Sequence, residues 1–284
     1  MRYFSTAILL LTCTAHFLSP SGVQGQFTAE PPYIATEMEL VDAMLQLAYV
    51  GSSDVLFDLG SGDGRIPIRA AQRFGTRGVG YEHKVPLVEL SRARAARAGV
   101  DHRVRFHAED LFQADLRSAT VVTLYLGAVF NLRLRPRLLS QLRPNSRIVS
   151  NTFHLGDWRP DSTVHFGSGA TRAMLHLWVV PARVDGFWSL AVEGAPLGYA
   201  VEFDQRFQHG SGVARAGRRA HSISGLHLRG DSIHFRFSLD AGQEPARFSG
   251  RVAGDRMEGH TQTPQGSRRW LAIRFTHPGL APEE

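Results

Sequence analysis

Two acidic residues on either side of a glycine-rich turn are the part of this sequence whose types and spacing point most directly to chemistry. Asp58 lies near the end of the apolar run 55–59, which is typical of a buried parallel strand, and Glu82 ends the next apolar run. Glycines let a main chain approach a ligand closely, and an acid about 20 residues beyond such a turn can accept hydrogen bonds from ribose hydroxyls. The pattern therefore predicts a nucleoside-binding site. Its glycines alternate along the chain: Gly60, Gly62 and Gly64.

The spacing of these glycines narrows the choice of ligand. A dinucleotide-binding turn has the pattern G-x-G-x-x-G, whereas residues 60–64 read G-x-G-x-G, which argues against a pyrophosphate ligand. The amides at the start of the helix expected after residue 64 can bind a carboxylate, and Asp58 can orient these amides or bind an ammonium group. The thirteen histidines show no metal-binding spacing, so we predict no metal site. No G-x-S-x-G motif is present, so we predict no serine nucleophile.

Strand-like and helical segments alternate between residues 27 and 184. Strands that alternate with helices in this way predict an α/β fold, a doubly wound and mainly parallel seven-stranded sheet. The glycine turn then connects a strand to the helix that follows it. The expected strands cover residues 55–58, 77–82, 103–107, 120–126, 147–153, 163–167 and 174–180, and the expected helices cover residues 37–49, 65–74, 86–98 and 132–142.

The pattern changes near residue 185. From residue 186 to residue 276 no long helical stripe is present, and short strands recur about every 8–12 residues with glycine turns between them. These strands predict a second, small antiparallel all-β domain, either a closed barrel or a sandwich, and residues 277–284 are expected to be a tail. The aromatic residues expected to fill its interior are Trp188, Phe203, Phe207, Phe235, Phe237, Phe248 and Trp270.

The first 25 residues differ from the rest of the chain. Arg2 precedes an apolar run over residues 3–18, and small residues lie around Gly25. This is the pattern of a secretory signal peptide cut after Gly25, which predicts an exported protein, periplasmic or extracellular. An uncleaved membrane anchor is the alternative, with membrane association through residues 1–25. Cys13 is the only cysteine and lies in this segment, so a mature chain is expected to have no disulfide.

The composition is that of an ordinary globular protein rather than a disordered one, since 43% of the 284 residues are hydrophobic and 20% are charged. The formal net charge is +6, and Lys84 is the only lysine, so arginine supplies almost all of the positive charge. The arginines are scattered among acidic residues rather than clustered. We therefore expect no nucleic-acid partner.

Seven motifs follow one another along the first domain, at residues 32–36, 41–45, 58–66, 78–82, 110–112, 119–126 and 146–158. This ordered set resembles the seven-β-strand lysine methyltransferases that modify the c subunit of ATP synthase and the ADP/ATP carrier. These are class I enzymes that use S-adenosylmethionine (AdoMet). The resemblance does not extend to the second domain. It implies a Rossmann-like methyltransferase domain over residues 27–184, AdoMet as the cofactor and a protein lysine amine as the methyl acceptor.

The resemblance also implies roles for residues around the glycine turn. The turn at residues 60–64, which includes Ser61, would pass under the aminoacyl and ribose groups of the cofactor, and Glu82 would bind the two ribose hydroxyls. Tyr33 and Thr36 match the segment that folds over the cofactor in this family.

Further roles are implied after the third and fourth strands. Asp110 matches the position that binds the adenine amino group, and Leu111 or Phe112 would pack on the adenine ring. Tyr125 ends the fourth strand, where class I methyltransferases present the substrate pocket. We assign no general base.

Two other functions remain open. In one, the protein is an exported, non-enzymatic binding protein in which the methyltransferase fold is a relic and the β domain binds an apolar ligand or a partner. The other is methylation of a nucleic acid, for which the arginine excess is the only support. We rank it lower because residues 124–126 read Leu-Tyr-Leu where such enzymes have an Asn-Pro-Pro-Tyr type of motif.

Overall fold

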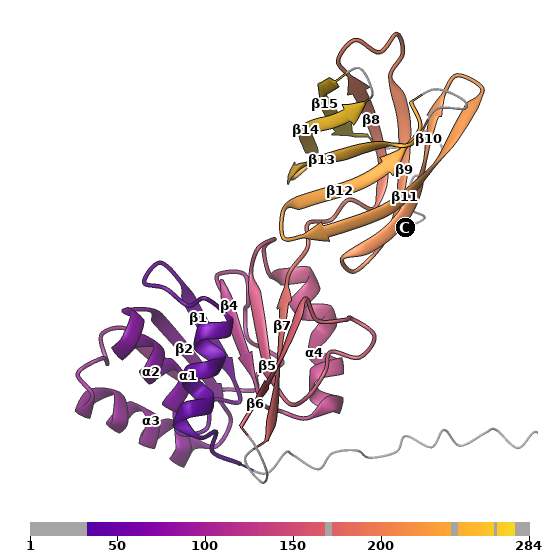
Figure 1. The fold of residues 1–284 in the computed structure, drawn as a ribbon. Helices are drawn as coiled ribbons and strands as arrows, with labels where there is room; N and C mark the ends of the chain where they lie inside the picture. The colour runs from indigo at the N-terminus through magenta and orange to yellow at the C-terminus, as the bar shows by residue number, and fades with distance from the viewer. Residues whose placement is uncertain (1–32, 168–171, 240–243, 264–265, 276–284) are drawn as a thin grey trace, which may run out of the picture. The chain divides into compact units, whose positions relative to one another are not determined.

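The computed structural model describes residues 33–167, 172–239, 244–263 and 266–275 (Figure 1). The expected signal peptide or anchor at residues 1–25 and the expected tail at residues 277–284 lie outside the described residues, so both stay predictions. Within the described part of the chain, no helix is both long enough and apolar enough to cross a membrane.

The first part of the fold is a seven-stranded sheet with the order β3-β2-β1-β4-β5-β7-β6. Strands β1 to β5 pair in parallel, whereas β7 is antiparallel to both β5 and β6. The predicted mainly parallel sheet is therefore confirmed. The strands are β1 (Val55–Leu59), β2 (Arg77–Glu82), β3 (Val104–Ala108), β4 (Val121–Leu124), β5 (Arg147–Asn151), β6 (Ser162–Phe166) and β7 (Ala173–Val179), and the helices are α1 (Met38–Leu47), α2 (Arg65–Phe74), α3 (Val85–Arg97) and α4 (Ala128–Gln141).

Helices cover both faces of this sheet. Successive side chains of a strand point to opposite faces, so a strand that is covered on both sides is apolar throughout. Leu56 and Val121 pack with residues of α1 and α2 in one core cluster, whereas their neighbours Phe57 and Val122 pack with residues of α4 in another. Figure 1 shows α4 on the side of the sheet opposite to α1 and α2. Packing on both faces holds the central strands in place, and with them the glycine turn at the end of β1.

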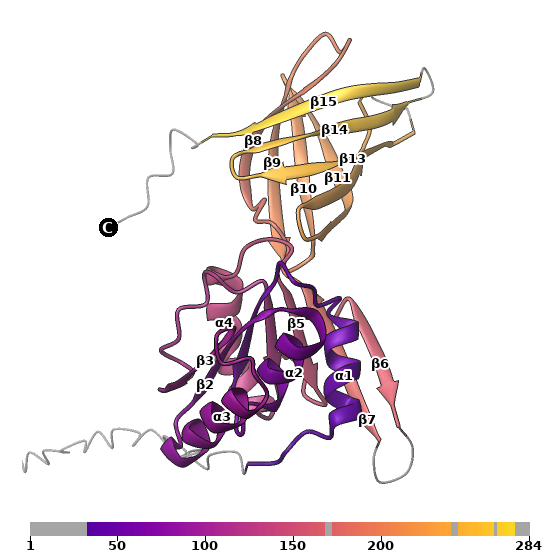
Figure 2. The same ribbon diagram turned by 90° about the vertical axis from the view of Figure 1, so that its left-hand side faces the viewer.

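The second part is a closed barrel of eight strands, in which β15 pairs with β8 to complete the ring (Figure 2). All of its pairs are antiparallel. Of the two predicted architectures, the barrel is the one observed. Its strands are β8 (Gly186–Val192), β9 (Tyr199–Arg206), β10 (His209–Ala216), β11 (Arg219–Arg229), β12 (Ser232–Phe237), β13 (Ala246–Ala253), β14 (Arg256–Thr263) and β15 (Gly266–Arg274).

Large aromatic side chains fill the barrel interior. Phe235, Phe248 and Trp270 are all at most 2% exposed, and the ring centroids of Phe235 and Phe248 lie 4.7 Å apart. Phe237 stacks on Phe248 from 4.6 Å. Every aromatic residue predicted to fill the interior belongs to this core except Phe207, which lies in the turn between β9 and β10 with a φ of 56°. The prediction for Phe207 was wrong because the strand pattern was extended through a turn.

We expect Phe248→Ala to lower the free energy of unfolding by about 3–5 kcal/mol, because the surrounding rings cannot close the cavity it leaves. Ile273 on β15 is 42% exposed, so Ile273→Ala is expected to cost less than about 1 kcal/mol. Urea unfolding followed by tryptophan fluorescence measures both losses. Equal losses in the two variants would contradict a packed interior.

Candidate cofactor site at the ends of the central strands

The glycine turn lies at the carboxyl end of β1, whose neighbours in the sheet are β2 and β4. The backbone amides of Gly60 and Ser61 both donate to the carbonyl oxygen of Tyr81 on β2, over 2.8 and 3.0 Å. The turn is thereby attached to the end of the neighbouring strand. The sheet order also reverses at β1 and β4, so the turn lies where open α/β sheets bind their ligands.

The three glycines of the turn all adopt left-handed backbone conformations. Their φ angles are 81° at Gly60, 51° at Gly62 and 75° at Gly64, a region in which other residues are strained. A Cβ atom on Gly62 would lie 2.4 Å from the ring of Tyr33, and one on Gly60 would lie 2.4 Å from Cδ2 of Leu126. The turn is therefore bare backbone with two side chains packed closely against it.

The carboxylate of Glu82 faces this turn. Its Oε2 atom accepts a hydrogen bond from the amide of Gly62 at 3.1 Å, and its Oε1 atom accepts one from the amide of Lys84 at 2.9 Å. The residue is only 8% exposed. A carboxylate oxygen accepts more than one hydrogen bond, so Glu82 can still accept donors from a ligand that lies over the turn.

Asp58 is buried on β1 next to Thr123 of β4. The hydroxyl of Thr123 donates to Oδ1 of Asp58 over 2.7 Å. Burial raises the pKa of Asp58 to about 7; the nearby charges of Asp63 and Glu82 push it in the same direction, and the hydrogen bond from Thr123 opposes them. Asp58 is therefore an acid whose charge depends on what binds beside it.

Asp63 is a third buried acid in this region, and its surroundings keep it ionised at neutral pH. It is 2% exposed, forms an ion pair with Arg65 at 2.6 Å and also pairs with Arg94 of α3. Burial alone raises its pKa, but the hydrogen bonds and charge of Arg65, with contributions from Tyr33 and Arg94, lower the pKa to about 2. This role of Asp63 was not predicted; its only signal in the sequence is that Asp63 lies inside the glycine turn, two residues before Arg65.

The segment before α1 is held against the glycine turn. Arg65 donates from Nη1 to the carbonyl oxygen of Thr36 at 2.7 Å, and a side-chain hydrogen bond joins Tyr33 to Asp63. Thr36 is buried, whereas Tyr33 is 45% exposed. The structure thus brings both of these sequence-predicted residues to the turn.

The other sequence-predicted cofactor residues lie around the turn in different ways. Leu111, after β3, approaches to 4.0 Å from a Cβ atom built on Gly60, whereas Phe112 is buried against Phe130 with ring centroids 5.7 Å apart. Asp110 is exposed, and its Oδ1 atom accepts a hydrogen bond from the amide of Phe112 at 2.9 Å. Of the two residues predicted to pack on a ring, Leu111 is therefore the one beside the turn.

Ser61 points away from the open side of the turn. A Cβ atom built on Gly80 of β2 would lie 2.6 Å from the hydroxyl of Ser61, so this side chain is directed toward the sheet. Its hydroxyl is buried and makes no hydrogen bond to any described residue. Only the backbone of Ser61 is then available to a ligand.

An aromatic pair lies at the ends of β4 and β5. The rings of Tyr125 and Phe153 stack with centroids 6.1 Å apart and planes inclined by 28°. Nδ2 of Asn131, which is fully buried on α4, donates to the carbonyl oxygen of Phe153 at 3.0 Å and to the hydroxyl of Ser150 at 3.1 Å. Neither Phe153 nor Asn131 was predicted. Because Leu126 packs on Gly60, the pair is close to the glycine turn.

Comparisons with known proteins agree with this geometry. The sequence profile of the ANTKMT methyltransferase domain matches residues 58–162. A protein-lysine N-methyltransferase of Saccharolobus islandicus is 34% identical over 150 residues, which are 52% of this chain and 93% of that relative. The adenine nucleotide translocase lysine N-methyltransferase of Mus musculus is 33% identical over 59% of this chain and 72% of that protein.

This chain belongs to the ANTKMT family of methyltransferases. Among solved structures, an RNA methyltransferase from Salinibacter ruber in complex with S-adenosyl-L-homocysteine is 47% identical, with a TM-score of 0.51 over 53% of this chain and 96% of that chain. The cofactor is therefore AdoMet, and the protein is an AdoMet-dependent methyltransferase, as predicted. The family match ends before β8, so it does not include the barrel.

The residues present fit AdoMet. The turn is backbone without side chains at its glycines, the carboxylate of Glu82 faces it from the end of β2, and the buried acid Asp58 precedes it, so two acids are available to a ligand with two cationic groups. The family alignment and these contacts argue against the alternative in which the methyltransferase fold is a relic.

Replacing Glu82 tests the proposed ribose contact. We expect Glu82→Ala to weaken AdoMet binding about 10- to 100-fold, because it removes both the predicted acceptor for the ribose hydroxyls and the acceptor for the Gly62 amide, a loss of roughly 1–3 kcal/mol. Isothermal titration calorimetry measures the affinity. Glu89 is an exposed acid on α3, and Glu89→Ala is the matched control, expected to bind AdoMet normally. Unchanged affinity in a folded Glu82→Ala variant would exclude this contact.

The raised pKa of Asp58 predicts pH-dependent binding. Below pH 7 the free protein holds a proton on Asp58, whereas the cationic sulfonium and ammonium groups of AdoMet favour the ionised carboxylate. Binding therefore releases a proton, and affinity rises as the pH increases through 7. We expect the Kd to be about tenfold higher at pH 6 than at pH 8, measured by calorimetry in two buffers of different ionisation enthalpy. The idea fails if Asp58→Asn shows the same pH dependence.

Proposed function

We propose that this protein transfers a methyl group from AdoMet to the ε-amine of a lysine in a protein substrate. The observation that carries the proposal is the 34% identity to a protein-lysine N-methyltransferase over 93% of that relative's length. A second lysine methyltransferase, matched over 72% of its length, supports the same class of substrate.

The residues proposed to hold the cofactor are those of the glycine turn and the segments packed around it. Glu82 accepts hydrogen bonds from the ribose hydroxyls, and Asp58 faces the ammonium group. Leu111 packs on the adenine ring, with Asp110 next to its amino group. The complete proposed set is Tyr33, Thr36, Asp58, Gly60, Ser61, Gly62, Gly64, Glu82, Asp110 and Leu111.

The aromatic pair Tyr125 and Phe153 is proposed to receive the lysine side chain. AdoMet, when bound, supplies a methyl group that its positive sulfur already activates, so the protein mainly has to align the acceptor with it. A lysine ammonium must lose a proton before it can attack. Aromatic rings exclude water from the amine and thereby lower its pKa, which favours the neutral, nucleophilic form. Asn131 acts as a positioning residue, because it holds the backbone of Phe153.

RNA methylation is the second candidate. It is favoured by one observation, the 47% identity to the Salinibacter ruber protein, whose structure is described as that of an RNA methyltransferase. The same pocket would then have to receive a base instead of a linear amine. The two candidates differ in the chemical nature of the methylated product, which is directly measurable.

Transfer of a labelled methyl group from AdoMet to separate protein and RNA fractions distinguishes them. We expect label in protein, recovered after acid hydrolysis as ε-N-methyllysine. Tyr125→Ala and Phe153→Ala should lower kcat/KM at least about tenfold, a transition-state loss of roughly 1.4 kcal/mol, without changing AdoMet affinity.

Tyr49 provides the control for this experiment. It is 77% exposed and has a φ of 50°, so Tyr49→Asn keeps a residue that tolerates this backbone. This variant is expected to retain full activity. Label found in RNA alone, or equal losses in the Tyr49 and Tyr125 variants, would overturn the lysine assignment.

A further inference from the structure

The barrel offers its outer face rather than its interior for binding. Trp188, Phe203 and Phe237 are each at most 2% exposed inside it, together with the other interior aromatic rings. Alternate residues along each strand therefore point outward. On β12 to β15 these outward residues form rows that cross the strands, and two adjacent rows contain no acidic residue.

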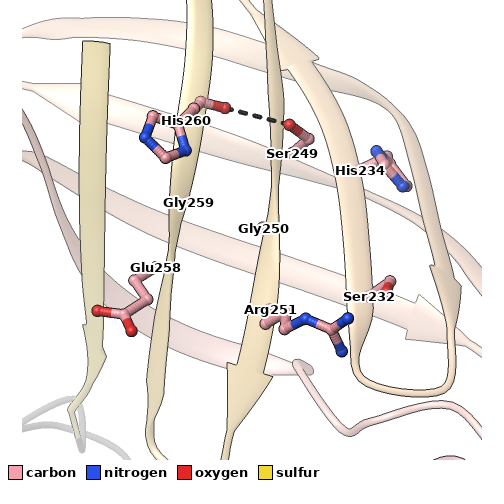
Figure 3. A pocket seen from close by; sticks show the side chains of 8 residues that line it. All are labelled: Ser232, His234, Ser249, Gly250, Arg251, Glu258, Gly259 and His260. Atoms are coloured by element: carbon pink, nitrogen blue, oxygen red, sulfur yellow. Dashed lines mark hydrogen bonds between the residues drawn. The ribbon is translucent and has the colours of Figure 1, made fainter.

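The first row consists of exposed polar residues that are direct neighbours in the strand register. His234 pairs with Ser249, Ser249 pairs with His260, and His260 pairs with Arg269. All four are exposed. Figure 3 shows His234, Ser249 and His260 next to one another across three strands. Within the described part of the chain, no three histidine, cysteine or acidic side chains are grouped as metal ligands, so this row is not a metal site.

The second row lies two residues further along each strand. Arg236 pairs with Arg247, Arg247 with Gln262, and Gln262 with Ser267, and all four are exposed. Like charges directly opposite each other in a sheet are unfavourable. Arg236 and Arg247 nevertheless form no ion pair with any acid among the described residues. An anionic partner would relieve this repulsion.

Acidic residues are absent from both rows and are already paired in the row next to them. Arg251 forms an ion pair with Asp231 at 2.8 Å, and Glu258 forms one with Arg256 at 2.7 Å. The face therefore has a compensated side and an uncompensated side. Among the described residues, the uncompensated side contains the guanidinium groups of Arg236 and Arg247. Arg269 lies beside them, but it is nearer to acids: its charge lowers the pKa of Glu258, and its backbone amide donates to Glu193 at 3.3 Å.

A shallow hollow of about 390 Å³ lies between the first row and the paired row. His234 and His260 stand on either side of it, with the small side chain of Ser249 between them and Arg251 below (Figure 3). Imidazole, hydroxyl and guanidinium groups are all hydrogen-bond donors to phosphate oxygens. The hollow thus presents several donors along its edge. Glu258 also lines it, and its carboxylate is paired with Arg256.

We propose that this face binds single-stranded nucleic acid through its phosphate groups. Neighbouring strands are about 4.8 Å apart, so each row places donors across four strands along a path of roughly 14 Å, which suits a linear polymer with repeated charges. The first row continues through His227 on β11 and His209 on β10, whose ring centroids are 5.0 Å apart.

The chemistry of the rows favours this partner over a membrane. Neither row contains an apolar side chain, whereas segments that lie in a membrane interface insert apolar groups. Apart from histidine the rows contain no aromatic ring, so little base stacking is available and the binding is insensitive to sequence. This proposal departs from the expectation of no nucleic-acid partner, which was based on the scattered arginines. It is independent of which atom the enzyme methylates.

Fluorescence anisotropy of the full chain with a labelled 20-nucleotide single-stranded RNA, over a series of salt concentrations, tests the proposal. Three arginine–phosphate contacts predict a slope of log K against log salt of about −2, and Arg236→Gln with Arg247→Gln should reduce its magnitude to about 0.7. No AdoMet is needed, so failure here is distinguishable from failure of the proposed methyl transfer.

A matched double variant controls for net charge. Arg218 and Arg219 are exposed at the turn between β10 and β11, away from both rows, and Arg218→Gln with Arg219→Gln removes the same charge. It is expected to keep the full slope. Equal effects of the two double variants would overturn the proposal, and so would binding to vesicles of anionic phospholipid without binding to RNA. Circular dichroism of each variant establishes that the barrel remains folded.

Discussion

The hydrogen bond from the Gly62 amide to the Glu82 carboxylate is the interaction on which the cofactor site depends. It joins the turn after β1 to the end of β2, and it exists only because Gly62 can adopt a φ of 51°. A buried carboxylate is costly unless it accepts hydrogen bonds, and the amides of Gly62 and Lys84 satisfy both oxygens of Glu82. The turn and the acid therefore fix each other's position, and the ligand is presented with a preformed surface.

The three buried acids of this region are stabilised in three different ways, and this decides the charge of the site. The charge of Asp63 is neutralised by ion pairs with Arg65 and Arg94, so Asp63 stabilises the turn instead of offering a charge to a ligand. Backbone amides donate hydrogen bonds to Glu82. Asp58 stays protonated until the pH rises above its pKa of about 7. Because the charge of Asp63 is neutralised, the charges that a ligand meets are those of Glu82 and of ionised Asp58, which are negative. A cofactor with two cationic groups, the sulfonium and the ammonium, is complementary to them.

The parts of the site that could be predicted from the sequence are those encoded within a few consecutive residues. Asp58 and the glycines form one local motif, and Glu82 ends the next strand. Asn131 could not be predicted, because α4 begins at Ala128 whereas the predicted helix began at residue 132. The pairing of Tyr125 with Phe153 was also unpredictable, since it depends on β4 and β5 being neighbours and on the backbone turn at the end of β5.

The outer face of the barrel follows from its interior. Side chains alternate along a strand, so a slip of one residue in β13 would move Phe248 to the surface and Arg247 into the core. The burial of Phe248 against Phe235 therefore fixes the register that places Arg247 opposite Arg236. Arginines that are scattered in the sequence become neighbours because aromatic packing sets the strand pairing. The repulsion between these two arginines is then a cost that the apolar core imposes on the surface, and a bound phosphate chain would remove it.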